Sequence, residues 1–430
     1  MSTIHFEKQI PLLGEYDVCV VGGGPAGVAC AIASARQGNH TLLIEGTPSL
    51  GGMATSGLVG PFMTNYDRDG KEKTVDGLFG EIVRRLAEDG SALPSDDIPT
   101  HSIYTSFIER YHAHVTPFHS FRLEQLLDKM TRECGVDVYC YTHFCDAIVK
   151  DGTIETILVS APEGLRAIRA KVFVDATGIA SLAESAGVPT YKGEEKSGIP
   201  QPATLMFEVE GADDDAFLAF GARPRRPVKV YRTPSKGRYK VNHYHIYNVD
   251  ASSAKSLTEA HAEARLQVDD ALRVLREETP GFENATLAAV APVLGIRESR
   301  HIVGDVTITV DDIRLGTKFP DRIATYGFGM DVHNRNESES GNFKVEIAER
   351  YYIPYRALVP KNVTNLLVCG KTISCESQAA GGLRCMPSAI AMGEAVGIAT
   401  SLARKANGDV RSVDIGRLQD LLRKAGAILD

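Results

Sequence analysis

The feature that most constrains the fold lies in Tyr16–Glu45, YDVCVVGGGPAGVACAIASARQGNHTLLIE. A short apolar run predicts a buried strand, and it leads directly into Gly22, Gly24 and Gly27. The Ala-rich stretch Pro25–Gln37 then predicts a helix. Glycines at this spacing allow a tight turn, the close approach of a pyrophosphate and close packing of the helix on the strand. Since the N-terminus of that helix would face the phosphates with free N–H groups, the chain is expected to bind a dinucleotide here.

The residues after this unit bear on which dinucleotide binds. Glu45 ends a second predicted strand, where a carboxylate accepts hydrogen bonds from ribose hydroxyls and would repel a 2′-phosphate. The segment GGMAT (Gly51–Thr55) either runs close against a cofactor or forms a flexible surface loop. The stretch VFVDATG (Val172–Gly178) places small residues at the end of a buried strand, where the backbone would pass near the pyrophosphate.

From about residue 136 the predicted order of elements changes to strand, turn, strand, turn, strand. The turns are marked by Asp151-Gly152 and Glu163-Gly164. A domain that binds only NAD would continue with alternating strands and helices. A βαβ unit followed by a three-stranded meander is instead typical of the FAD-binding flavoprotein fold.

The second half of the chain predicts an inserted domain, after which the chain returns to the first domain. Strands are expected in ATLMFEVE, in RYKVNHYHIYNV and over most of LAAVAPVLGIRESRHIVGDVTITVDD, with a long charged helix over Ser256–Glu278. The apolar run NLLVCG and a Gly/Ala-rich helix, Met386–Arg404, then return to the first domain. We therefore predict an α/β protein with a Rossmann-like FAD-binding fold, a three-stranded β-meander and an inserted α+β substrate domain. The predicted parts are 14–199 (FAD-binding domain, first part), 200–349 (inserted substrate domain), 350–406 (FAD-binding domain, second part) and 407–430 (C-terminal helix).

The Met386–Arg404 helix has one face of small residues. Ala389, Gly393, Gly397 and Ser401 recur every four positions, so this face can lie close to a neighbouring backbone. The helix either directs its N-terminal dipole at the edge of a flavin or is a core helix with small residues for packing.

Composition excludes some classes of partner. The chain of 430 residues has a net charge of −8 and a pI of about 5.9, which argues against nucleic acid as the main partner. No apolar run approaches the roughly 18 residues that span a bilayer, and the N-terminus lacks the pattern of a secretory signal. We therefore expect a cytoplasmic protein that acts on a small molecule, without a membrane or nucleic-acid partner.

Three longer motifs extend this prediction: GGMATSGLVGPF, GIRESRHIVGD and YYIPYRALVPKNVTNLLVCGKTIS followed by GGLRCMPSAIAMGEAVGIA. In order and spacing they resemble the FAD-dependent oxidoreductase family of the two-dinucleotide-binding-domain flavoproteins, over about residues 15–405. The resemblance implies FAD as the cofactor. It implies that the ADP half is held by Gly22, Gly24, Pro25, Ala26, Gly27 and Glu45, with the backbone of Phe144 at the adenine. It also implies that the pyrophosphate and flavin lie along Gly51, Gly52, Met53, Thr55, Thr177, Gly178, Gly370 and the segment from Leu383 to Met386.

The redox partner of the flavin is constrained by what the sequence lacks. No second GxGxxG follows a strand, so a separate NAD(P)H domain is not expected. Cys140 and Cys145 have the spacing of a redox disulfide, but in the meander, five apart on a strand, they would point to opposite faces. Cys369, Cys375 and Cys385 cluster near the expected flavin end, either as packing residues or as a reactive thiol.

A hydride donor needs a base for its O–H or N–H proton, and a carboxylate substrate needs a cation. Asp331 and His333 would share one face of an extended segment as an acid-oriented base, with His333 the first choice for the base. Arg297 and Arg384 are the predicted cations. Further candidates are Glu298, Arg300 and His301, and for each the alternative is a structural ion pair.

His243, His245 and Tyr247 would share one face of a strand in the insertion. Two histidines at i and i+2 can chelate a metal, but no third ligand is evident, so we expect pocket lining or solvent exposure and no metal.

These observations predict an FAD-dependent dehydrogenase or oxidase that transfers a hydride between a small polar organic substrate and FAD. No histidine lies near Gly51–Thr55 in the sequence, so the FAD is expected to be non-covalent. The alternative is an electron-transfer or binding subunit of the same fold that acts on a protein partner. The intact Glu45, GGMAT and ATG elements favour the enzyme. The sequence carries no signal for the substrate, the electron acceptor or the oligomeric state.

Overall fold

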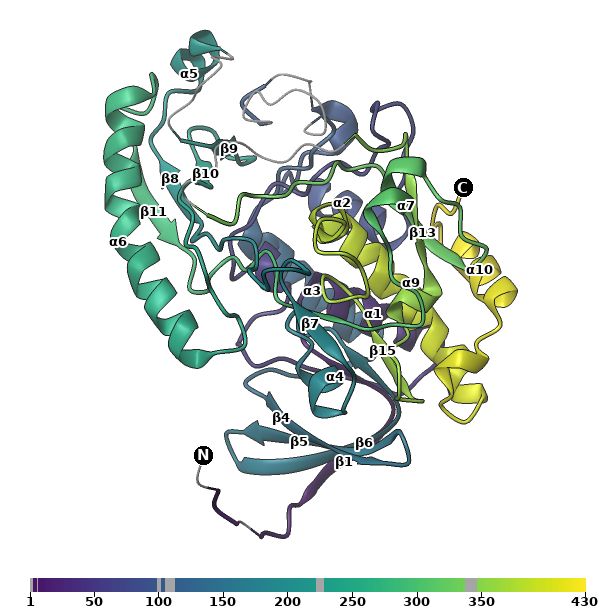
Figure 1. The fold of residues 1–430 in the computed structure, drawn as a ribbon. Coiled ribbons are helices and arrows are strands. Elements are labelled where there is room, and N and C mark those ends of the chain that lie inside the picture. Colours follow the sequence, from purple (N-terminus) through teal and green to yellow (C-terminus); the bar gives the residue numbers. More distant parts are fainter. Residues whose placement is uncertain (1–2, 6, 99–101, 105–112, 222–227, 337–345) are drawn as a thin grey trace.

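The computed structural model describes residues 3–5, 7–98, 102–104, 113–221, 228–336 and 346–430 (Figure 1). Its centre is a seven-stranded sheet flanked by helices, which confirms the predicted α/β class. The sheet contains, in spatial order, β3 (Asp137–Tyr139), β2 (Thr41–Ile44), β1 (Leu12–Val21), β6 (Gly164–Asp175), β5 (Thr153–Ala161) and β4 (His143–Lys150), with β15 (Leu366–Val368) paired to β6.

The parallel part of this sheet forms because its strands are apolar on both faces. All four residues of β2 and all three of β15 are buried, which is typical of parallel strands covered by helices on both sides. β1 pairs in parallel with both β2 and β6, and β15 pairs in parallel with the C-terminal end of β6. The chain thus returns after residue 365 to complete the sheet that its N-terminus began.

The predicted meander is present as β4, β5 and β6, which pair antiparallel in sequence order. The stretch before Asp151 is two strands, however, and not one. β3 pairs with β2, the chain turns at Tyr141 with φ of 56°, and β4 then begins at His143. Cys140 and Cys145 therefore lie on either side of a turn, so the prediction that they share one strand was wrong.

Helix α1 (Pro25–Arg36) packs along α9 (Met386–Lys405) at the centre of the molecule (Figure 1). The small face of α9 makes this contact possible. A β-carbon at Gly393 would lie 2.1 Å from the carbonyl oxygen of Ala26, and one at Gly397 would lie 2.3 Å from that of Cys30. Close helix packing therefore accounts for the spacing of small residues. By length and composition α9 could cross a membrane, but 83% of its apolar window is buried inside the protein, where it forms part of the core.

The remaining elements cover this core or extend it. Around the sheet lie α2 (Leu78–Ala87), α3 (Ser120–Glu133), α4 (Ser181–Ser185), α7 (Val310–Leu315), α8 (Ala380–Leu383) and α10 (Ile415–Lys424), with two ribbons formed by β7 (Thr190–Lys192) and β12 (Arg300–Ile302), and by β13 (Arg322–Tyr326) and β14 (Tyr351–Pro354). Single turns of 3-10 helix occupy Gly52–Ala54, Ser95–Asp97, Tyr355–Leu358 and Val410–Ser412.

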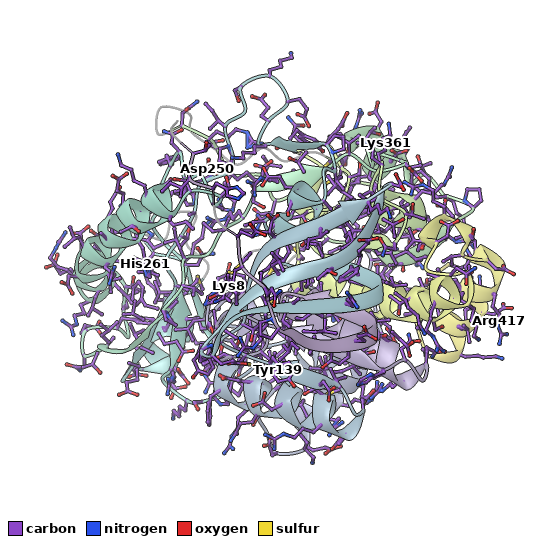
Figure 2. All side chains as sticks on the ribbon, turned by 90° about the horizontal axis from the view of Figure 1, so that it is seen from below. Lys8, Tyr139, Asp250, His261, Lys361 and Arg417 are labelled. Carbon is purple, nitrogen blue, oxygen red and sulfur yellow. The ribbon has the colours of Figure 1, made fainter. Side chains whose placement is uncertain are left out.

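A second sheet with its own apolar core lies beside the first. Its spatial order is β11 (Thr286–Val290), β8 (Phe207–Glu210), β10 (Tyr239–Val241) and β9 (Val230–Arg232). Its helices are α5 (Asp214–Phe220) and α6 (Ala254–Glu278), and α6 covers the outer side (Figure 1). Figure 2 shows His261 on α6 and Arg417 on α10, at opposite sides of the molecule. We call residues 203–294 the second lobe, because the core formed there is separate from that of the main sheet.

The structure corrects the strand predictions for the insertion. Only Tyr239–Val241 of RYKVNHYHIYNV is a regular strand, and between β11 and β12 the chain is mostly irregular. The end of VTITVDD is helical because the Thr309 hydroxyl accepts from the N–H of Asp312, whose carboxylate accepts from the Thr309 N–H. Since β12, α7 and β13 contribute residues to the cores of the main sheet, we propose that the inserted domain ends near residue 296 and not at 349.

One buried carboxyl gives the fold a predicted pH dependence. The carboxylate of Glu394 on α9 is buried and accepts a hydrogen bond of 3.1 Å from the N–H of Leu78, at the start of α2. Burial raises the pKa of Glu394 from 4.5 to about 7. A raised folded-state pKa means that its stabilising contribution is complete below pH 4.5 and is lost as the pH rises through 7.

We therefore expect Glu394→Gln to be more stable than the wild type at pH 8, by about 2–3 kcal/mol, and nearly equal to it at pH 4.5. Denaturant unfolding at both pH values measures this difference. The exposed Glu88→Gln is the matched control and should change stability little at either pH. Equal stabilities of Glu394→Gln and wild type at pH 8 would contradict the prediction.

Candidate cofactor site and active site

The glycine-rich loop between β1 and α1 has the shape that the sequence predicts. Gly22 has φ of 107°, and a β-carbon there would lie 2.6 Å from the carbonyl oxygen of Ala176 at the end of β6. A β-carbon at Gly27 would lie 1.8 Å from the carbonyl oxygen of Gly22, so the helix lies directly on the turn. At Gly24 a β-carbon would meet nothing within 4 Å. The loop is therefore packed at its first and third glycines and open at the second, where a phosphate would approach.

Glu45 lies beside this loop. Its carboxylate accepts hydrogen bonds from the N–H groups of Gly23, at 2.7 Å, and Thr47, at 2.8 Å. A β-carbon at Gly46 would lie 2.6 Å from Nδ1 of His143, so the start of β4 touches the turn that follows Glu45. The structure thus brings the strand of Phe144 to the acidic end of β2, where the resemblance implies the adenosine half.

The GGMAT segment is fixed against the glycine-rich loop. The N–H of Gly51 donates to the carbonyl of Gly23 at 2.8 Å, and a β-carbon at Gly52 would lie 3.1 Å from the Cα of Gly24. The Thr55 hydroxyl donates to the carbonyl of Leu50 at 2.6 Å. Met53 is half-buried in the 3-10 turn of this segment. Of the two interpretations of GGMAT, the structure therefore excludes a flexible surface loop.

Motifs from distant parts of the chain meet at the end of β6. The Thr177 hydroxyl donates to the Asp175 carboxylate at 2.7 Å and shapes the ATG turn, and the carbonyl of Gly178 accepts from the Ser299 hydroxyl at 2.7 Å. The ammonium of Lys371 donates to the carbonyl of Ile296 at 2.6 Å. The ATG and GIRES motifs and the turn after β15 therefore form one wall.

Gly370 and the start of α9 border the same wall. Gly370 has φ of 88°, and a β-carbon there would lie 3.3 Å from that of Ala26 in the first turn of α1. Leu383 is buried, Arg384 is half-buried, and Met386 opens α9. The predicted flavin-binding residues thus form a band from the N-terminus of α1 to that of α9.

The donors along this band fit a ligand rich in oxygen and nitrogen acceptors. The buried Nε2 of Gln201 and Nε of Arg384 have no hydrogen-bond partner among the described residues. The opening at Gly24, the helix N-terminus behind it and the acid at the end of β2 are the donor and acceptor set of a dinucleotide site. The residues present therefore fit an extended flavin dinucleotide.

The predicted catalytic residues gather beside Arg384. Nη2 of Arg384 donates to the Asp331 carboxylate and to its carbonyl, both at 2.9 Å. Nε2 of His333 lies 3.2 Å from the same Asp331 oxygen, Oδ2. Nδ1 of His333 lies 3.0 Å from Nε2 of His245, and the two rings are nearly perpendicular, at 88°. These four side chains form a continuous hydrogen-bonded chain, which we call the relay.

Arg297 lies near the relay without a carboxylate in direct contact with it, although the charge of Asp331 acts to raise its pKa. It is only 9% exposed, and its Nη1 donates to the carbonyl of Pro202 and the hydroxyl of Thr204, each at 2.7 Å. Its Nη2 donates to Oδ1 of Asn242 at 3.3 Å. Within the described residues no carboxylate lies within ion-pair distance, so the alternative of a structural ion pair is wrong for Arg297 although it holds for Arg384.

The charges set the protonation of the relay. Burial alone would raise the pKa of Asp331, but the hydrogen bond from His333 and the charges of Arg384 and Arg297 hold it well below its usual value. Burial, followed by the charge of Arg297, lowers the pKa of His333 to about 4 and that of His245 to about 3. Burial also lowers the pKa of Arg297, to about 10. At neutral pH the relay thus contains a carboxylate and two neutral imidazoles.

The other polar candidates have structural partners. The buried Glu298 accepts from Nη1 of Arg335 at 3.1 Å and from the N–H of Gln201 at 2.8 Å. Arg300 pairs with Glu184, and the buried His301 lies 3.7 Å from the thiol of Cys375.

The cysteines near the expected flavin end are packing residues. All eight are free thiols, and Cys369 and Cys375 are fully buried. Burial raises the pKa of Cys385 to about 12, so this thiol is protonated at neutral pH. Of the two interpretations of this cluster, packing therefore fits the structure better than a reactive thiol.

Two residues of the site carried only a weak signal in the sequence. His245 was expected to line a pocket or face solvent, and its bond to His333 joins residues 88 positions apart. Lys229 is half-buried with its pKa lowered by burial, and the charge of Asp331 opposes this shift. No acid pairs with Lys229 in the described part of the chain, so it is a second cation near Arg297.

Comparison with known proteins agrees with this geometry. The model of the family described as FAD dependent oxidoreductase matches residues 17–422. Digeranylgeranylglycerophospholipid reductase 2 of Methanothermobacter thermautotrophicus is 25% identical over 206 residues, covering 47% of this chain and 48% of the relative. The 3-oxosteroid 1-dehydrogenase of Mycolicibacterium smegmatis is 36% identical over 91 residues, covering 20% of this chain and 15% of the relative. The chain thus spans about half the length, or less, of these curated relatives.

Solved structures resemble the chain only in outline. A geranylgeranyl bacteriochlorophyll reductase-like protein from Thermoplasma acidophilum is 15% identical with a TM-score of 0.47, covering 95% of this chain and 83% of that one. The L-amino acid deaminase from Proteus myxofaciens is 13% identical with a TM-score of 0.49, covering 97% and 95%. The family match extends over both parts of the main sheet, the second lobe and the relay. The chain therefore belongs to the FAD dependent oxidoreductase family, and the protein is an enzyme whose cofactor is FAD.

Proposed function

We propose that the enzyme transfers a hydride between non-covalently bound FAD and a small polar substrate that carries an anionic group. The observation that supports this substrate class is Arg297, a buried cation whose hydrogen-bond acceptors are all neutral. A buried charge without a counterion is costly, and a substrate carboxylate or similar anion would offset that cost. Lys229, also unpaired by an acid within the described residues, adds to the positive field.

The residues that would hold FAD follow from their places along the band. Gly22, Gly24, Pro25, Ala26 and Gly27 would face the pyrophosphate with the N-terminus of α1, and Glu45 would accept from the ribose. The flavin half would lie along Gly51, Gly52, Met53, Thr55, Thr177, Gly178, Gly370, Leu383 and Met386, with Phe144 at the adenine. When bound, FAD supplies the acceptor or donor of two electrons as a hydride.

The chain's own residues would bind the substrate and move its proton. Arg297 would fix the anionic group, and Arg384 holds Asp331 in place by two hydrogen bonds. The carboxylate of Asp331 in turn orients His333. The site thus pairs a cation for binding with a polar chain for proton transfer, as oxidation of an alcohol or amine next to an anionic group requires.

An absorbance spectrum of the purified protein, repeated on the supernatant after acid precipitation, tests the cofactor. Flavin bands that remain in the supernatant support non-covalent FAD. Anaerobic addition of 2-hydroxy acids, amino acids, simple amines and neutral sugars then tests the substrate class. Bleaching by an anionic member and not by its uncharged analogue supports the proposal. Bleaching by none of them would overturn it and favour an electron-transfer role with a protein partner.

The open position at Gly24 gives a sharper prediction for the cofactor. Its φ of −69° suits any residue and its β-carbon would meet nothing, so Gly24→Ala should fold normally. The added methyl group would stand where the pyrophosphate approaches, so FAD affinity should fall by about tenfold or more. Titration of the apoprotein with FAD, followed by flavin fluorescence, measures this. Gly416→Ala on α10 is the matched control, and an unchanged FAD affinity for Gly24→Ala would place the pyrophosphate elsewhere.

A further inference from the structure

We infer that Nδ1 of His245 is the atom that accepts the substrate's proton, and that His333 positions His245 without itself acting as the base. This inference rests on the proposed function, since it assigns the proton step of that reaction. It replaces the prediction that His333 is the base. The reason is that both ring nitrogens of His333 are already occupied within the protein.

The tautomers follow from the charge at one end of the relay. Asp331 is ionised, so its carboxylate only accepts, and Nε2 of His333 must carry the hydrogen that is donated to it. His333 is neutral, so its Nδ1 then holds a lone pair. The group 3.0 Å from that lone pair, Nε2 of His245, must carry a hydrogen. Since His245 is also neutral, its Nδ1 is left with a free lone pair.

The exposure of the two rings also favours His245 as the base. His333 is only 4% exposed, whereas His245 is half-buried, and no hydrogen bond within the described parts of the chain engages its Nδ1. His245 follows β10 of the second lobe, while Asp331 and His333 follow β13 of the main body. The relay therefore fixes the second lobe's base against the wall that carries the predicted flavin-binding residues.

The charges around His245 connect substrate binding to its basicity. Burial is the largest cause that lowers its pKa, followed by Arg297, His333 and Lys229, while Asp331 raises it. An anion bound at Arg297 would offset the second of these causes and increase the proton affinity of Nδ1. The anionic group of the substrate would thereby strengthen the base that acts on it.

The reaction needs a substrate with an H–C–X–H group, in which X is oxygen or nitrogen. The X–H bond breaks and its proton bonds to Nδ1 of His245, and the electron pair left on X forms the second bond of C=X. The C–H bond breaks at the same carbon, which gives up a hydride to FAD. The substrate is oxidised by two electrons, FAD is reduced by two, and the proton stays on His245 until it passes to solvent.

Long-range ¹H–¹⁵N NMR of the FAD-loaded enzyme tests the tautomers without any substrate. His245→Gln and His333→Gln identify the two sets of ring signals. At pH 7 we expect both rings to carry hydrogen on Nε2 and an unprotonated Nδ1, with Nδ1 of His245 in the chemical-shift range of a weakly bonded lone pair. Hydrogen on Nδ1 of His245 would overturn the inference, whatever substrate the enzyme uses.

Flavin reduction by the best anionic substrate of the panel tests the chemistry. His245→Ala should lower the first-order rate of flavin reduction by about 10²–10⁴-fold, and added imidazole should restore part of it. The pH profile should lose the limb on which the wild-type rate falls towards acid pH. The matched control is His243→Ala. The ring of His243 lies against that of Tyr244, with centroids 4.1 Å apart and the planes tilted by 51°, and the variant should reduce the flavin at the wild-type rate.

His333→Gln separates the two roles. If His333 only positions His245, His333→Gln should reduce the flavin more slowly than the wild type. Its pH profile should keep the acid limb, and imidazole should not restore the rate. If added imidazole restored the rate of His333→Ala, and His245→Ala kept a rate near that of the wild type, His333 would be the base. That result would overturn the inference. If no substrate bleaches the flavin, the proposed function fails, and the NMR tautomers alone then support or overturn the assignment of the free lone pair.

Discussion

Replacement of Gly393 by alanine is expected to cost a large part of the protein's stability. The added β-carbon would lie 2.1 Å from the carbonyl oxygen of Ala26, 2.9 Å from its carbonyl carbon and 3.0 Å from its Cα. All three are backbone atoms of α1, so no side-chain rotation relieves the clash, and α1 and α9 must move apart. Overpacking of a rigid core costs about 1–3 kcal/mol, and a backbone clash of this kind about 3–5 kcal/mol.

Urea unfolding of the apoprotein measures this loss directly. Ser401→Ala, on the same face of α9, adds no atom and removes only a hydrogen bond to the carbonyl of Ile398, so it is the matched control and should cost under about 1 kcal/mol. Because α1 presents its N-terminus to the phosphates, Gly393→Ala should also weaken FAD binding. A midpoint of unfolding equal to that of Ser401→Ala would show that the two helices do not approach as described.

Replacement of Asp331 by asparagine is expected to lower the rate of flavin reduction strongly while the protein still folds. Arg384 and His333 both donate to one oxygen of the carboxylate, Oδ2. An amide oxygen in that place lacks the negative charge that orients both donors, and the other end of the amide is a donor that cannot accept from either. If the amide nitrogen faces His333, the hydrogen of that ring must move to Nδ1, and the direction of the relay reverses. Asparagine at such an orienting acid lowers turnover by up to about 10⁴ in the serine proteases, and we expect about 10²–10³ here.

Anaerobic stopped-flow reduction of the flavin by a panel substrate measures this loss, with FAD content as the check on folding. The matched control is Asp305→Asn, which breaks a comparable Asp–Arg contact between Asp305 and Arg411 at the surface. We expect Asp305→Asn to leave the rate within about threefold, since surface ion pairs contribute little. A rate for Asp331→Asn in the same range would remove Asp331 from the proton-transfer chain.

The predictions that held concern local backbone. Gly22 and Gly27 in the loop and Gly393 and Gly397 on α9 must be glycine, because a β-carbon at any of these positions would collide with backbone. Such constraints can be read from a short window of sequence. The predictions that failed also have local causes, since RYKVNHYHIYNV alternates like a strand but is a regular strand only over Tyr239–Val241. The Thr309 cap turned the next expected strand into a helix.

By itself the sequence thus determined the dinucleotide-binding unit, the meander, the FAD family and the identity of Asp331, His333, Arg297 and Arg384 as candidates. Which of these side chains have partners depends on how the chain packs in three dimensions. Arg384 gained a carboxylate and Arg297 did not, and His245 met His333 across 88 residues. The physical reason is that backbone shape depends on neighbours along the chain, whereas protonation depends on the charges and burial that packing brings together from distant segments.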